Sequence, residues 1–278
     1  MRIDAHQHFW LMRDRTGQWP PAELAAIHRD FVPDDLQPVL TRCGIGGTVL
    51  VQSLPSVEDT TFLLDIADQS TFVRGVVGWL ELKAPEAPAQ IASLSAHPKL
   101  KGLRPMLQDI ADVNWINDPI LNPAIRAMIS HELRFDALVM PEHLTALTMF
   151  AERHPDLPIV IDHGAKPRIA KGFFRGWHAD MRRLAALPNV QCKLSGLLTE
   201  AGSAPGIAAI RPYAETLLDL FGERRLIWGS DWPVLNLAGS YEVWLSMCLD
   251  IVPLEHHDAV FGGNAIAFYG LESGPSQP

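Results

Sequence analysis

Eight short apolar runs, each bounded by glycine, proline or polar residues, recur along this chain of 278 residues. Short bounded runs of this kind predict strands. Residues 47–51, Gly-Thr-Val-Leu-Val, are apolar on both faces, as expected for a parallel sheet that is covered on both sides. The predicted strands are Arg2–His8, Gly47–Ser53, Phe72–Leu82, Leu100–Leu107, Leu133–Met140, Pro158–Ala165, Val190–Leu197 and Arg225–Pro233.

Helical patterns separate these runs, whose first residues are 25 to 45 positions apart. That spacing suits βα units of about 30 residues, and eight of them predict a (β/α)8 TIM barrel that forms a single domain over residues 1–271. An open, doubly wound sheet is the competing architecture, but no Gly-x-Gly-x-x-Gly sequence follows the first run. The tail, residues 272–278, is rich in glycine, proline and serine and is predicted to be disordered.

Two helices carry clear end signals, and two segments are predicted to be long loops. Ser56 is expected to cap one amphipathic helix, and a second helical pattern runs from Ile207 to Phe221 and closes at Gly222. Residues 9–31 and 108–118 are irregular excursions after the first and fourth predicted strands. Both leave the carboxyl ends of strands, where barrel enzymes place the loops that cover a substrate.

Charge and composition narrow the class of partner. The net charge of −9 argues against nonspecific nucleic-acid binding, which needs a basic surface. No apolar run approaches the roughly 18 residues of a membrane span, and no signal peptide is recognisable at the amino end. The three cysteines are widely spaced and form no Cys-x-x-Cys pair, which is typical of a reducing compartment. We therefore expect a cytoplasmic protein with a small-molecule substrate, of undetermined oligomeric state.

Polar and aromatic side chains gather where the predicted strands end. His6 and His8 are two positions apart, so on a strand they project from the same side. The carboxyl ends of barrel strands meet at one face, which carries the catalytic groups of barrel enzymes. Besides these two histidines, that face is predicted to hold Gln52, Trp79, Glu81, Arg104, His163, Lys193, Ser195, Asp231 and Trp232.

Four of these side chains also have a purely structural explanation. Asp231 can cap the turn that follows its strand. His163 can be a core histidine bonded to its neighbour Asp162. Lys193 and Ser195 share one face of their strand and can form hydrogen bonds inside the barrel without meeting a substrate.

Arg104 presents a sharper choice. A guanidinium on a barrel strand must face either a ligand or an internal carboxylate, because an unpaired buried charge is too costly. Arg104 is therefore predicted either to bind substrate or to form an internal salt bridge, for which the chain offers Asp136 and Glu81.

In this order, the strand-end residues resemble a known family. A His-x-His first strand, a histidine on a later strand and an aspartate on the eighth resemble the amidohydrolase superfamily, in its amidohydrolase 2 branch. Within that branch they are similar to the sugar-lactonase-like group of L-fuconolactonases, L-rhamnonolactonases and 2-pyrone-4,6-dicarboxylate lactonases. The resemblance covers the chain to residue 271 and is carried by Ile3-Asp4-Ala5-His6-Gln7-His8-Phe9-Trp10, Gly102-Leu103-Arg104-Pro105, Ile161-Asp162-His163, Cys192-Lys193-Leu194-Ser195-Gly196-Leu197, Gly229-Ser230-Asp231-Trp232-Pro233, Gly263-Asn264-Ala265 and Phe268-Tyr269-Gly270-Leu271.

The resemblance implies hydrolysis of an ester bond inside a ring, with water as the nucleophile. Asp231 would accept the proton of that water. His6, His8 and His163 would polarise the lactone carbonyl, directly or through a metal. Arg104 would hold a substrate carbonyl or carboxylate. The other expected substrate contacts are Trp10, Trp79 and Trp232, which suit the apolar faces of a sugar ring, and Lys193.

The sequence leaves metal dependence open. The fourth and fifth predicted strands offer no bridging carboxylate or lysine, so a binuclear site is not expected. One divalent ion, Zn²⁺, is chemically compatible with a ligand set drawn from His6, His8, His163 and Asp231.

These observations predict a lactonase that opens a sugar-derived aldonolactone to the aldonic acid. A lactonase for a dicarboxylate pyrone-type lactone is the alternative, and it would need several cations around the pocket. A decarboxylase of the same branch would need an obligatory metal, so chelation separates it from the lactonases. A binding protein on an inactive barrel would have no need of the complete histidine and aspartate set. The lactone, its stereochemistry and its ring size stay open.

Overall fold

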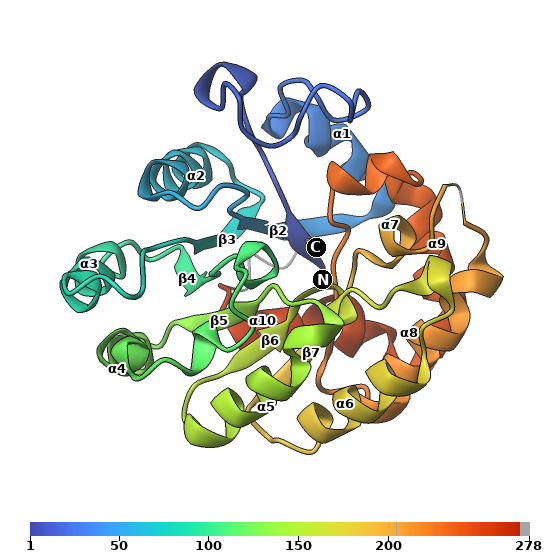
Figure 1. The fold of residues 1–278 in the computed structure, drawn as a ribbon. Coiled ribbons are helices and arrows are strands. Elements are labelled where there is room, and N and C mark those ends of the chain that lie inside the picture. Colours follow the sequence, from blue (N-terminus) through green and yellow to red (C-terminus); the bar gives the residue numbers. More distant parts are fainter. Residues whose placement is uncertain (204, 273–278) are drawn as a thin grey trace.

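The computed structural model describes residues 1–203 and 205–272, and its strands form one parallel eight-stranded sheet in the order β1 to β8. Figure 1 looks along the sheet's central axis, with the helices arranged around the strands. The isolated parallel bridge between Gln7 and Trp232 closes the sheet into a barrel. The strands are β1 (Arg2–Gln7), β2 (Ile45–Val51), β3 (Val73–Gly78), β4 (Leu100–Leu103), β5 (Arg134–Ala137), β6 (Ile159–Ile161), β7 (Val190–Leu194) and β8 (Leu226–Trp228).

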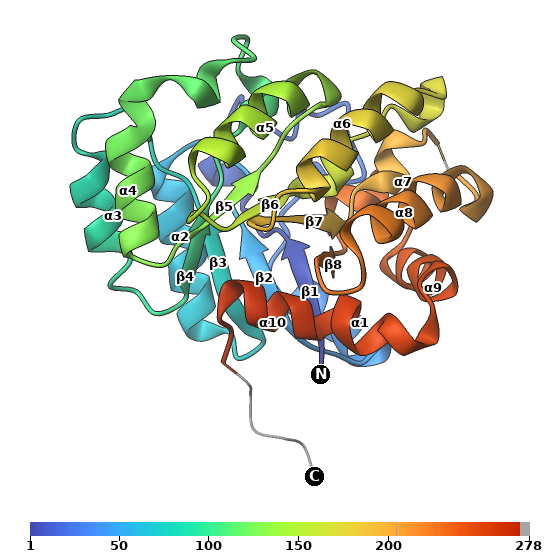
Figure 2. The same ribbon diagram turned by 90° about the horizontal axis from the view of Figure 1, so that it is seen from below.

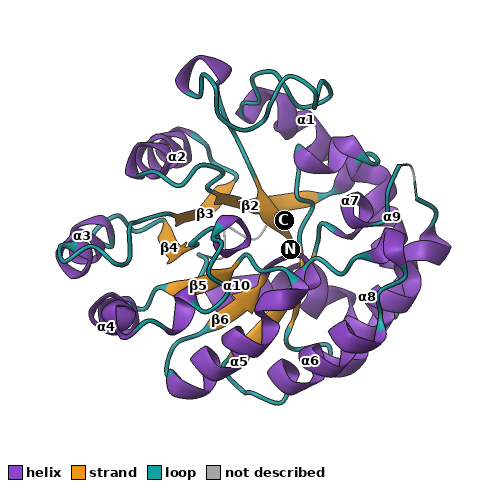
Figure 3. Cartoon of the chain, in the orientation of Figure 1, coloured by secondary structure: helices purple, strands orange, loops and turns teal. Residues whose placement is uncertain are grey.

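Helices follow the strands in alternation and cover the outside of the barrel (Figure 3). This is the (β/α)8 TIM barrel predicted from the sequence. The helices are α1 (Pro33–Cys43), α2 (Val57–Gln69), α3 (Ala87–Leu94), α4 (Asn122–Ser130), α5 (Leu144–Arg153), α6 (Arg175–Ala185), α7 (Leu197–Glu200), α8 (Ile207–Phe221), α9 (Tyr241–Ile251) and α10 (Asn264–Tyr269). Among the described residues, none of the helices is long and apolar enough to cross a membrane.

The predicted strands start within two residues of the observed ones but end up to five residues too late. The predicted strand Pro158–Ala165, for example, forms ladder pairs only over Ile159–Ile161. The reason is that side chains beyond the last ladder pair remain buried, as Asp162 and Ala165 are. Burial sets the sequence pattern, and it does not reveal where the backbone leaves the sheet.

The end signals of two helices are confirmed. The Ser56 hydroxyl accepts a hydrogen bond from the backbone N–H of Asp59 and so caps α2. Helix α8 spans Ile207 to Phe221 and is followed by Gly222, whose positive φ of 68° favours glycine.

The first predicted excursion, residues 9–31, packs against the rim of the barrel beside α1 (Figure 1). Its anchor is Arg15, which is 2% exposed and donates hydrogen bonds to Asp59 at 3.1 Å and to the Ser53 hydroxyl at 3.1 Å. The same guanidinium lies over the Trp10 ring, 5.3 Å from its centroid. This buried ion pair therefore fixes the long loop that leaves β1.

Helix α10 closes the end of the barrel at which the strands begin (Figure 2). Phe268, Tyr269 and Leu271 pack there against apolar side chains from inside the barrel, among them Ile3 and Val160. The catalytic face must therefore be the opposite one. Of the predicted tail, residues 272–278, only Glu272 belongs to the described residues, so the predicted disorder lies outside them.

Candidate active site

His6 and His8 enter the barrel because β1 changes register. Asp4 pairs with Thr48 and Gln7 pairs with Leu50. Between these two pairs β1 advances by three residues and β2 by two, so β1 contains one extra residue. Such a bulge re-aims the side chains that follow it. The ring centroids of His6 and His8 lie 4.9 Å apart in an edge-to-face arrangement. The backbone of Gly229 permits this placement, since a Cβ atom there would lie 2.7 Å from the Cβ of His6.

His163 follows β6 in a left-handed backbone conformation, with φ of 54°. Its Nδ1 lies 2.9 Å from the hydroxyl of Ser195, so the predicted alternative of a bond to Asp162 is wrong. Gly196 makes room for this ring, because its φ is 65° and a Cβ there would lie 2.6 Å from Nδ1 of His163. The His163 ring centroid is 4.4 Å from that of His6.

The three histidines converge on one oxygen of Asp231. The distances to Oδ1 are 3.3 Å from Nε2 of His8, 3.7 Å from Nε2 of His6 and 3.9 Å from Nε2 of His163. Asp231 follows β8 with φ of 60°, a conformation that is strained for a residue with a side chain, and such strain is concentrated at functional sites. The structure thus brings together the four residues of the predicted catalytic set.

Electrostatics fix the charge state of this cluster. Burial alone would raise the pKa of Asp231, but His163, His8 and His6 outweigh it and lower the pKa below its usual value. Burial lowers the pKa of His163 to about 4. Burial and the neighbouring Lys193 lower the pKa of His6 well below its usual value. At neutral pH, an ionised carboxylate therefore faces two neutral imidazoles.

His8 adds a constraint of its own. Its Nδ1 lies 2.7 Å from the carbonyl oxygen of Val51, which can only accept a hydrogen bond, so Nδ1 carries a proton. In a neutral ring, Nε2 would then point a lone pair at the Asp231 oxygen, 3.3 Å away. Two acceptors in contact require a positive charge between them. Either a second proton on His8 or a bound cation satisfies this pair.

The donor set fits a single metal ion. His6, His163 and Asp231 offer ligand atoms that all lie within 4.8 Å of one another. A tetrahedral Zn²⁺ with bonds of about 2.1 Å separates its ligand atoms by about 3.4 Å. The separations of 3.7 and 3.9 Å from Asp231 need only small side-chain shifts to reach that geometry. His8, also predicted as a ligand, lies next to Asp231 but outside this group of three.

Arg104 lies at the end of β4 and is 3% exposed. Its Nη1 donates to Oδ2 of Asp162 at 3.2 Å and lies 3.3 Å from Nε2 of His6, while Nη2 donates to the carbonyl oxygen of Gln52. The internal salt bridge considered for Arg104 therefore exists, but its partner is Asp162. The two predicted partners are placed elsewhere: Asp136 binds Lys193, and Glu81 is exposed.

Lys193 was predicted to contact the substrate, but the structure places it inside the barrel. It has no exposed surface, and its ammonium lies beneath the histidines between two carboxylates. The hydrogen bonds inside the barrel that were the alternative for Lys193 therefore exist, but their partners, Asp136 and Asp162, could not be read from the strand pattern alone. One sign of them is a carboxylate in the middle of a predicted apolar strand, as Asp136 is.

The three tryptophans are not equivalent. Trp10 has no exposed surface and donates from Nε1 to the Arg29 carbonyl, so it packs behind His8 and does not face a substrate. Trp232 is 5% exposed and stacks edge-on against Phe9 and Phe31. The first loop encloses Trp10, so the predicted contact for Trp10 is corrected. Trp232 is as little exposed as its neighbour Asp231 and stays a proposed contact. Trp79 is half-buried after β3 and remains a proposed contact.

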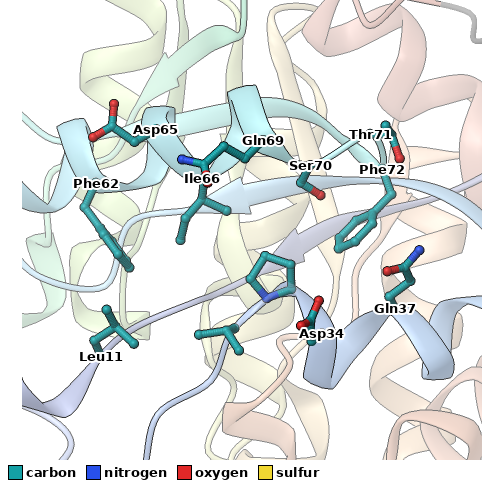
Figure 4. Close-up of a pocket in the computed structure, with 12 residues that line it drawn as sticks. Leu11, Asp34, Gln37, Phe62, Asp65, Ile66, Gln69, Ser70, Thr71 and Phe72 are labelled. Carbon is teal, nitrogen blue, oxygen red and sulfur yellow. The ribbon is translucent and has the colours of Figure 1, made fainter.

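A cavity of about 500 Å³ lies away from this cluster, between α1 and α2 (Figure 4). Its walls include the side chains of Leu11, Phe62, Ile66 and Phe72. None of the histidines or Asp231 lines it, so the active site is defined by its converging side chains and not by this cavity.

This closed βα barrel carries its histidines and its aspartate at the carboxyl ends of the strands, where barrel enzymes place their catalytic groups. The chain belongs to the amidohydrolase family, whose model matches residues 3–271. The chain is 56% identical to an L-fucono-1,5-lactonase of Burkholderia ambifaria over 98% of this chain and 96% of the relative. It is 36% identical to an L-fucono-1,5-lactonase of Burkholderia multivorans, with coverage of 98% and 96%. A crystal structure of a Burkholderia multivorans amidohydrolase with bound zinc has a TM-score of 0.92 and 35% identity, covering 98% of this chain and 100% of that one.

Proposed function

We propose that this protein hydrolyses the ring ester of a sugar-derived aldonolactone, with L-fucono-1,5-lactone as the first candidate substrate. The observation that carries the proposal is the convergence of three imidazole nitrogens on an ionised carboxylate, Asp231, at the catalytic face. Such a cluster can activate water and stabilise the negative charge that develops on a carbonyl oxygen. The choice of sugar is supported by the 56% identity to a relative with that activity.

In the proposed reaction, water attacks the lactone carbonyl carbon while Asp231 accepts a proton from it. His163 and His8 then stabilise the charge that forms on the carbonyl oxygen. The bond between that carbon and the ring oxygen breaks, and Asp231 returns its proton to the ring oxygen. The product is the open-chain hydroxy acid. Ser195 orients His163 through Nδ1, and the Val51 carbonyl orients His8 in the same way.

His6, His163 and Asp231 are the residues that would hold a Zn²⁺ ion. A bound ion would supply a Lewis acid for the carbonyl oxygen and lower the pKa of a bound water.

The cations near the site favour a neutral sugar lactone over a dicarboxylate. Arg104 is paired with Asp162, and Lys193 is buried between two carboxylates. At the rim, Lys166 donates to Gln108 at 2.7 Å and Arg168 is paired with Glu142. A doubly charged substrate would have to break these pairs to be bound, whereas a sugar lactone would leave them intact.

A panel of lactones tests this proposal. Purified protein is mixed with aldonolactones of both ring sizes and with 2-pyrone-4,6-dicarboxylate, and acid release is followed with a pH indicator. We expect the largest kcat/KM for L-fucono-1,5-lactone and no turnover of the dicarboxylate. Faster opening of the dicarboxylate than of every aldonolactone would overturn the substrate assignment.

Zinc should stabilise the folded protein. After chelation, Zn²⁺ added at 100 times its Kd should stabilise the native state by about 2.7 kcal/mol, which raises Tm by about 5–10 °C for a chain of this size. His163→Asn should abolish this shift, since asparagine tolerates the left-handed backbone there but lacks the imidazole. The matched control is His97→Asn, at a site where His97 contacts Asp68 on the surface. A full zinc-induced shift in His163→Asn would remove His163 from the ligand set.

A further inference from the structure

A chain of buried polar groups crosses the barrel from α10 to the catalytic face. The Tyr269 hydroxyl donates to Oδ2 of Asp136 at 2.7 Å. The Lys193 ammonium donates to the same oxygen at 2.6 Å. It also lies 2.9 Å from Oδ1 of Asp162 and 3.1 Å from Nδ1 of His6. Tyr269 is 2% exposed, and the other four residues have no exposed surface.

The surroundings of Lys193 match its chemistry. An ammonium has three N–H groups, and here its neighbours are two carboxylate oxygens and one imidazole nitrogen. The carboxylates of Asp136 in β5 and of Asp162, directly after β6, hold the charge of Lys193 in place from the two strands that precede β7. The third neighbour, His6, is the part of the active site on which this fixed charge can act.

That contact distinguishes the two flipped orientations of the His6 ring. Nδ1 of His6 faces Lys193 at 3.1 Å and Oδ1 of Asp162 at 3.4 Å. A rotation of the ring by half a turn would replace it by a C–H group, which can neither accept a hydrogen bond from Lys193 nor replace an N–H donor to Asp162. The same rotation would move Nε2 away from Asp231, which lies 3.7 Å from it. A fixed Lys193 on the Nδ1 side therefore favours the orientation in which Nε2 faces the catalytic aspartate, as does Arg104, whose Nη1 lies 3.3 Å from Nε2.

We infer that Lys193 and Tyr269 are positioning residues for His6: Tyr269 fixes Asp136, Asp136 fixes Lys193, and Lys193 fixes the imidazole ring. Tyr269 belongs to the helix that closes the opposite end of the barrel (Figure 2). The packing of α10 is thereby transmitted to the reacting groups. The effect on catalysis rests on the proposed lactonase function, whereas the orientation of His6 does not.

Tyr269→Phe tests this inference, because it removes the hydroxyl and keeps the ring. We expect kcat on the best lactone to fall about tenfold, as is usual when an outer hydrogen bond to an active-site residue is lost, with KM nearly unchanged. The matched control is Leu271→Val, which trims the same apolar cluster without touching the polar chain. A similar loss of kcat in Leu271→Val would mean that general loosening of α10 is the cause, and would overturn the inference.

Nuclear magnetic resonance supplies a readout that needs no substrate. In protein labelled at the histidine Cε1 positions, the His6 resonance should shift in Tyr269→Phe and stay in place in Leu271→Val. The His6 resonance can be measured even if the protein turns over no lactone. Failure of the inference can therefore be distinguished from failure of the proposed function. An unshifted His6 resonance in Tyr269→Phe would overturn the inference.

A stronger variant removes the ammonium itself. Lys193→Met alone would leave the buried Asp136 carboxylate without a cation and is expected to unfold. It is therefore combined with Asp136→Asn, which keeps the buried charge balanced between Arg104 and Asp162. We expect the double variant to fold, to lose about 100-fold in kcat and to show a displaced or doubled His6 resonance. A folded double variant with wild-type kcat and an unaltered His6 resonance would show that Lys193 serves structure alone.

Discussion

Asp231→Asn should lower kcat/KM for the best lactone by about 10³-fold, within the range for loss of a general base. The amide has the shape of the carboxylate but cannot accept the proton of the attacking water. Three imidazole nitrogens face the carboxylate oxygen at 3.3–3.9 Å, so the substitution also removes the negative charge around which the cluster is built. The measurement is steady-state kinetics, accompanied by thermal melting to confirm that the variant is folded.

The pH profile gives the same residue a second test. Burial raises the pKa of Asp231, but the histidines lower it by more, so the group stays ionised below the usual range for an aspartate. The loss of kcat/KM caused by its protonation should therefore appear only at strongly acidic pH. Asp156→Asn, at an exposed position that precedes β6 on the face opposite the active site, is the matched control and should keep wild-type kinetics. Near-wild-type turnover by Asp231→Asn would reassign Asp231 to a structural role.

The sequence was sufficient to predict the barrel because each strand is a short buried run, and burial leaves a periodic signal. It was sufficient to place His6, His8, His163 and Asp231 on one face because the carboxyl ends of barrel strands meet there. Neither step depends on details of side-chain packing.

The salt-bridge partner of Arg104 and the solvent exposure of Trp10 could not be predicted from the strand pattern. Asp136 and Asp162 both point into the barrel, and the stagger between neighbouring strands decides that Arg104 meets Asp162. Trp10 suited a sugar ring by its chemistry, but the loop of residues 9–31 folds back over it through contacts that lie far apart in sequence. Strand periodicity carries no information about either arrangement.

Arg104→Met should destabilise the fold by about 3–5 kcal/mol, the range for breaking a buried salt bridge. The guanidinium is 3% exposed, and Asp162, its partner at 3.2 Å, is fully buried. Methionine fills much of the same volume but leaves the Asp162 carboxylate with less compensation. For a chain of this size, Tm should fall by about 10 °C, which differential scanning calorimetry would measure.

The matched control is Arg168→Met, which breaks the ion pair with Glu142 at the rim. Both of those side chains are more than 40% exposed, so the pair is screened by water and the substitution should change stability by less than about 1 kcal/mol. The contrast between the two variants isolates burial as the cause. If Arg104→Met instead kept its melting temperature and lost kcat/KM by about 10-fold or more, a loss typical of a hydrogen bond to a charged group, Arg104 would be a substrate contact. The salt bridge with Asp162 would then be a resting arrangement that the lactone displaces.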